Sequence, residues 1–183
     1  ETGQWEAVGL APVDSVEGRH GNWVAVVGMS AAHRGDMDGA KAAEARLRSL
    51  SESAEAAGNQ YDARQNAILE NQVAAIRLLK SGDSDGAVAA AKNAAEMEVQ
   101  YMRVPSGPPK PMKPANELYA QVLLEADRPE EAKAAFEQSL AWTPLRTPSM
   151  MGLAKAAEKT GDNETAHDMY TRLRTMPGAQ LMD

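Results

Sequence analysis

Four six-residue segments of the 183-residue chain follow one pattern, and this pattern constrains the fold more than any other feature. They read GDMDGA, GDSDGA, DRPEEA and GDNETA, at residues 35–40, 82–87, 127–132 and 161–166. The first residue, Gly or Asp, can adopt the left-handed conformation that ends a helix, and the next residues can cap a second helix. Acidic residues suit the positive end of that helix. Each segment therefore predicts a tight turn between two helices.

The spacing of these segments predicts which residues pack between helices. A small residue lies twelve positions before the alanine that ends each segment, which lets two helices approach closely. The last two of these alanines are 34 residues apart, and so are Phe136 and Tyr170. The predicted structural repeat positions are Gly28, Ala40, Ala75, Ala87, Ala120, Ala132, Phe136, Ala154, Ala166 and Tyr170.

Apolar residues recur every three to four positions on both sides of the turns, which is typical of helices with one packed face. The pattern predicts eight helices, near residues 16–34, 38–57, 61–81, 84–102, 114–126, 129–142, 147–160 and 163–176. The expected fold is all-α, an α-solenoid of four helix-turn-helix hairpins at residues 16–57, 61–102, 114–142 and 147–176. Residues 103–114 hold five prolines and predict an extended insert, either a spacer laid over the protein or a ligand for an aromatic groove.

This register resembles the tetratricopeptide repeat, a 34-residue helix-turn-helix unit. The match is best from Lys113 to Arg146 and continues from Thr147 to Met176. The first two units have longer spacings, and Glu44 stands where the family prefers an aromatic residue. The residues that carry the resemblance are Tyr119, Ala120, Leu123, Ala132, Phe136, Leu140, Pro144, Leu153, Ala154, Ala157, Gly161, Ala166 and Tyr170.

The ends of the chain are predicted to lie outside the repeats. Residues 1–3 are typical of an expression-vector sequence left after a secretory signal is cleaved. Residues 4–15 are expected to form an irregular lead-in, residues 16–176 a single helical domain, and residues 177–183 a tail. The chain is also similar to the C-terminal region of exported bacterial tetratricopeptide proteins without an assigned activity. This similarity implies an extracellular or periplasmic location.

Composition narrows the range of functions. The formal net charge of -7 opposes binding to a phosphate backbone or an anionic membrane. No apolar stretch reaches the roughly 20 residues of a membrane span. The chain lacks cysteine and has no nucleotide-binding or nucleophile motif, so we expect no enzyme activity and no cofactor.

The resemblance implies a function in binding. In tetratricopeptide proteins the first helix of each hairpin lines a concave groove that holds a peptide. By the same register, the groove residues are Asn22, Ala25, Met29, Gln72, Ile76, Glu117, Gln121, Leu124, Met151 and Lys155. The predicted function is a non-catalytic module that binds a protein or peptide. The alternative that some of these residues are covered by the lead-in or by the insert stays open.

Three further motifs suggest other chemistry. His20 and His33, with nearby methionines, suggest the alternative of a sensor or carrier that binds a small molecule or a metal such as copper or zinc, although no histidine pair has metal-ligand spacing. Residues 34–36 spell Arg-Gly-Asp, a tripeptide that integrins bind, in a predicted turn. Residues 163–165 form an acceptor sequence for N-linked glycosylation, also in a turn.

Overall fold

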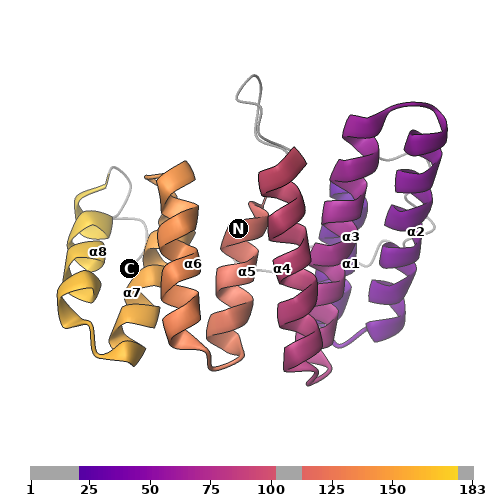
Figure 1. Cartoon of the computed structure of the whole chain (residues 1–183). Coiled ribbons are helices and arrows are strands. Elements are labelled where there is room, and N and C mark those ends of the chain that lie inside the picture. The colour runs from indigo at the N-terminus through magenta and orange to yellow at the C-terminus, as the bar shows by residue number, and fades with distance from the viewer. Residues whose placement is uncertain (1–20, 102–112, 177–183) are drawn as a thin grey trace. The chain divides into compact units, whose positions relative to one another are not determined.

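The computed structural model describes residues 21–101 and 113–176, and within these ranges it holds eight helices and no strand (Figure 1). They are α1 (Gly21–His33), α2 (Met37–Ala56), α3 (Gln60–Lys80), α4 (Ser84–Tyr101), α5 (Ala115–Glu125), α6 (Pro129–Trp142), α7 (Thr147–Thr160) and α8 (Asn163–Thr175). The all-α prediction is confirmed, and the described helix ends agree with the predicted ones to within one residue. Residues 16–20, predicted to begin the first helix, and most of the proline-rich insert lie outside the described residues.

Three of the four hexapeptides form the same turn. The glycine has a φ between +77° and +88°, and the space where a Cβ would stand is empty, so only the backbone conformation requires glycine. The following aspartate donates its N–H to the carbonyl five residues earlier, and its carboxylate accepts a bond from the N–H three residues later. These pairs are Gly35–Asp36, Gly82–Asp83 and Gly161–Asp162. Together the bonds satisfy the end of one helix and the start of the next.

The turn between α5 and α6 reaches the same shape with other residues. Asp127 has a φ of +59°, and Arg128 donates its N–H to the carbonyl of Leu123 at 2.9 Å. Arg128 stands at the N-cap position, but its side chain makes no capping bond, and Pro129 begins the helix. This turn therefore relies on proline and backbone hydrogen bonds where the others rely on a carboxylate.

A fifth turn of this kind joins α2 to α3, and the sequence analysis missed it. Gly58 has a φ of +75°, and the side chain of Asn59 accepts a bond from the N–H of Asp62 at 3.1 Å. Residues 58–63 read GNQYDA, so the same glycine and final alanine were present in the sequence. This segment has an asparagine at the capping position, and an asparagine oxygen caps a helix as well as an aspartate does.

The chain divides into two compact units, Glu1–Ala115 and Asn116–Asp183. In the first unit α3 packs against α1, α2 and α4 (Figure 1). Gly28 on α1 lies where these helices meet, because a Cβ there would stand 2.6 Å from the Cβ of Ala43 and 2.9 Å from Val73 Cγ1. A residue larger than glycine would force α1 away from α2 and α3.

In the second unit α7 packs against both α6 and α8. Phe136 on α6 is fully buried, and its ring occupies the space where Gly152 on α7 would carry a Cβ. Of the ten predicted repeat positions, all except Tyr170 are buried. Tyr170 is the counterpart of Phe136 one repeat later, and no helix follows it in the described part of the chain.

Candidate functional site

The ten predicted groove residues differ in how far solvent can reach them. Five are buried: Ala25, Met29, Gln72, Ile76 and Glu117. The other five are partly or fully accessible: Asn22, Gln121, Leu124, Met151 and Lys155. Asn22 belongs to the first unit and the remaining four to the second. In the described conformation a peptide could reach only these five side chains.

The side chain of Gln72 is hydrogen-bonded within the protein. Its amide Nε2 donates a 2.9 Å hydrogen bond to the carbonyl of Lys113, at the end of the proline-rich insert. Its Oε1 atom is buried and has no partner among the described residues. Nearby in sequence, the N–H of Ala115 donates to Glu98 Oε2 at 2.8 Å. At Gln72, therefore, the described end of the insert is hydrogen-bonded to a predicted groove residue.

Glu117 is the centre of a buried polar network in the second unit. Its carboxylate accepts two bonds from Arg146, at 2.7 Å from Nε and 3.0 Å from the second terminal nitrogen. It also accepts a 2.6 Å bond from the hydroxyl of Ser149, which is 3.1 Å from the hydroxyl of Ser139. Paired, bidentate geometry offsets the cost of removing this carboxylate from water. The network links α5 to α7. The Glu117 carboxylate is buried within it and is not accessible to a ligand.

The four accessible groove residues of the second unit lie on two helices, α5 and α7. Gln121 and Leu124 follow Glu117 by four and seven residues, so the three share one face of α5. Met151 and Lys155 are four residues apart and share one face of α7, a helix that the Glu117–Ser149 bond links to α5. Lys155 is exposed and has no ion pair within the described ranges. We call Gln121, Leu124, Met151 and Lys155 the α5–α7 face; it combines two apolar side chains, an amide and an ammonium group.

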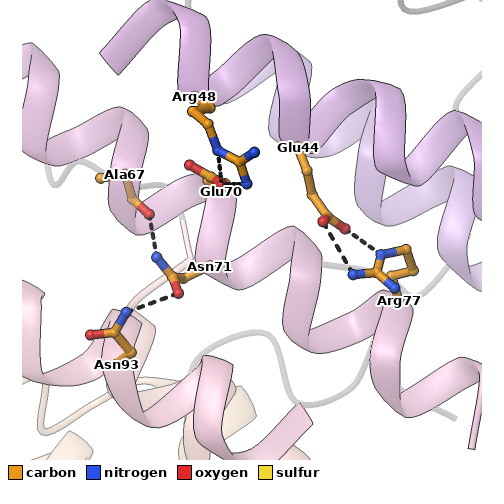
Figure 2. Close-up of polar contacts among 7 residues, drawn as sticks. All are labelled: Glu44, Arg48, Ala67, Glu70, Asn71, Arg77 and Asn93. Carbon is orange, nitrogen blue, oxygen red and sulfur yellow. Dashed lines mark hydrogen bonds and ion pairs between the residues drawn. The ribbon is translucent and has the colours of Figure 1, made fainter. Parts of the chain in front are cut away.

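In the first unit polar contacts link α3 to both of its neighbours in sequence (Figure 2). Arg77 binds Glu44 of α2 at 2.5 Å, with 17% and 12% of the two side chains exposed. Arg48 binds Glu70 at 2.5 Å, and Asn93 of α4 donates to Asn71 at 3.0 Å. Figure 2 shows each side chain turned toward its partner on the adjacent helix. Each of these polar groups is paired with a group on the neighbouring helix, so the contacts link the helices to one another.

Two polar contacts of the second unit shift pKa values. Lys133, followed by the N–H and hydroxyl of Thr165, holds the pKa of Asp162 at about 2. The Asp162 carboxylate therefore stays ionised and caps α8 at neutral pH. Burial, and then the hydrogen bond to Glu158, raises the pKa of the Tyr170 hydroxyl. The bonds of Asp162 hold the start of α8, and the bond between Tyr170 and Glu158 links α8 to α7.

Both charged residues of the Arg-Gly-Asp tripeptide form hydrogen bonds within the protein. Arg34 donates to the hydroxyl of Ser30, and the carboxylate of Asp36 accepts the N–H of Gly39 at 2.8 Å as the cap of α2. The cap accounts for Asp36 at this position, as the equivalent aspartates do in the other turns. The turn is therefore explained by its structural role.

The histidines lie apart in the described structure. His33 is half-buried at the end of α1 and His167 is exposed on α8, while His20 lies outside the described residues. Across residues 21–101 and 113–176, no three histidine or acidic side chains gather where they could hold a metal ion. In the same ranges, no helix is both long enough and apolar enough to cross a membrane, which agrees with the prediction of no membrane insertion.

Comparison of the chain with family models, with curated proteins and with solved structures finds no match. The class of the protein therefore rests on its own residues: the described parts are helical, with α1 to α4 packed in succession in the first unit and α6 to α8 in the second.

Proposed function

We propose that this chain is a tetratricopeptide-like α-solenoid and that its second unit is a non-catalytic module that binds a protein or peptide segment. Support for the repeat comes from the five equivalent turns and from the packing of consecutive helices. Support for binding comes from the α5–α7 face, which stays accessible while most predicted groove positions of the first unit are buried. This accessible face is the observation that carries the proposal.

The α5–α7 face has the chemistry that an extended peptide requires. Leu124 and Met151 are half-buried, so an apolar ligand side chain can bury further surface against them. Methionine adapts its shape to different ligand side chains because its chain is unbranched. Gln121 offers both an amide donor and a carbonyl acceptor to a peptide backbone, and Lys155 offers charge-assisted bonds.

The surface is also held in a fixed shape before any ligand binds. Glu117, Arg146 and Ser149 connect the two helices beneath it through bonds of 2.6 to 3.0 Å. A preformed surface loses less conformational entropy on binding than a flexible one. The buried network therefore contributes to binding indirectly, by keeping α5 and α7 at one spacing.

The test is a peptide selection on the whole chain. A displayed peptide library is panned on the wild-type protein, and the selected peptides are then measured against the double variant Leu124→Glu/Met151→Glu. We expect the double variant to lose at least tenfold in affinity, since two buried carboxylates would oppose an apolar contact. Ala134→Glu, at an exposed position of α6 in the same unit, is the matched control and should bind like the wild type.

Circular dichroism and thermal unfolding must show that the double variant is folded. Peptides that bind all three proteins equally, or a library that yields no binder, would refute the proposal. Met29 and Ile76 are unsuitable for this test, because both are buried and a glutamate there would unfold the first unit.

A further inference from the structure

Asn163 begins α8 and has no part in the fold or in the proposed binding surface. Asn163, Glu164 and Thr165 form the one Asn-x-Ser/Thr sequence of the whole chain. Asn163 is exposed, and its side chain makes no hydrogen bond within the described residues. The preceding residue, Asp162, caps α8 by accepting bonds from the N–H and the hydroxyl of Thr165. The amide of Asn163 is thus accessible and not needed for folding.

We propose that Asn163 is an acceptor site for an N-linked glycan. In this reaction the Asn163 Nδ2 atom forms a bond to C1 of the first sugar of a polyprenyl-pyrophosphate-linked oligosaccharide. The bond between C1 and the pyrophosphate oxygen breaks, polyprenyl pyrophosphate leaves, and the amide nitrogen releases one proton. No oxidant or reductant is required.

The folded turn has room for the sugar. Gly161 stands two residues before Asn163, and no atom lies within 4 Å of the position where its Cβ would be. His167, one helical turn after Asn163 on the same face of α8, is also exposed. A glycan on Asn163 would therefore extend from an exposed side chain and would break no side-chain hydrogen bond of Asn163.

The fold also restricts when the glycan can be added. The acceptor sequence requires the hydroxyl of its third residue, so the transferase must contact Thr165. In the folded protein this hydroxyl donates to Asp162 Oδ2 at 2.8 Å and Thr165 is half-buried. The transfer is therefore expected on the unfolded chain, before α8 forms, and not on the folded protein.

The site is tested by secreting the full chain from an animal cell and measuring its intact mass. We expect one discrete mass increment that an amidase specific for N-glycans removes. Asn163→Gln should abolish the increment, and Thr165→Ser should retain it because a hydroxyl remains. A secreted wild-type chain of unmodified mass would overturn the site, as would an increment that persists in Asn163→Gln.

The timing is tested separately with purified transferase and a lipid-linked oligosaccharide. The unmodified chain is offered folded, and again unfolded in the highest urea concentration that the transferase tolerates. We expect the unfolded chain to be modified at least tenfold faster than the folded chain. Asp162→Ala, which frees the Thr165 hydroxyl, should narrow the difference. Equal rates for folded and unfolded wild type would refute the protection by Asp162.

Discussion

The two units place different kinds of side chain at the same repeat position between consecutive hairpins. In each, the fourth residue after a turn alanine points to the first helix of the next hairpin. In the second unit this residue is Phe136, which fills the space left by Gly152. In the first unit it is Glu44, which pairs with Arg77 at 2.5 Å. A repeat position can therefore be kept while its contact changes from apolar burial to an ion pair.

This difference predicts unequal contributions to stability. Burying a phenyl ring gains free energy with no opposing desolvation of charge. A half-buried ion pair loses much of its attraction to the cost of removing both charges from water. The helix junction of the second unit should therefore be the more strongly stabilised, and substitutions at the two positions measure that difference directly.

The largest effect is expected from Phe136→Ala. Removing a fully buried phenyl group should lower the free energy of unfolding by about 4 kcal/mol, through lost burial and the cavity that remains. Urea unfolding followed by circular dichroism measures the change. Tyr170→Ala is the control at the same repeat position, and it should cost clearly less because Tyr170 is half-exposed. Equal costs would show that the junction with Gly152 adds nothing.

A loss of about 3 kcal/mol is expected from Glu117→Gln, because the side chain of Arg146 would lose its ionised partner beneath α5 and α7. The substitution preserves shape, and urea unfolding measures the combined loss of the charge and of one hydrogen-bond acceptor, because the amide nitrogen of glutamine cannot accept a bond. Replacing Arg146 as well, in Glu117→Gln/Arg146→Met, should recover part of the loss. If the double variant is as unstable as the sum of the two single variants, the network is not a coupled unit.

The difference between local and distant contacts explains what the sequence could predict. The helix ends followed from the turn segments because a cap such as that of Asp36 on Gly39 joins residues three apart. The bonds of Gln72 to Lys113 and of Glu117 to Arg146 join residues 41 and 29 apart, and they depend on how helices approach each other. Periodicity marks a face as apolar or polar, but it does not reveal that a polar residue such as Glu117 is buried beside a partner.

The same limit applies to the groove prediction. The register placed the groove residues on α1, α3, α5 and α7, and in the first unit α3 packs against three described helices and α1 against two. Met29 and Ile76 are buried, although their spacing matches that of the accessible Lys155. Exposure depends on which side of a helix its neighbours cover, which the repeat pattern does not specify.

A smaller effect, about 1 kcal/mol, is expected from Glu44→Gln, because the pair with Arg77 lies between the exposed and the fully buried extremes. The variant is the counterpart of Glu117→Gln, with the same change of charge at a less buried site. Urea unfolding in low and high salt provides the measurement, and salt should reduce the cost at Glu44 more than at Glu117. A larger cost at Glu44 than at Glu117 would contradict the ranking by burial.

The smallest effect is expected at the turn of the second unit that lacks glycine. Asp127→Gly relieves the left-handed strain at φ +59° but adds entropy to the unfolded chain and removes a 2.9 Å exposed ion pair with Lys159. These contributions oppose one another, so the free energy of unfolding should stay within about 0.5 kcal/mol of the wild type. Gly161→Ala meets the same strain, which outweighs the entropy removed from the unfolded chain, and should cost about 1 kcal/mol or more. Thermal unfolding of both variants provides the test. A clear stabilisation by Asp127→Gly would mean that the pair with Lys159 contributes little and that strain dominates this turn.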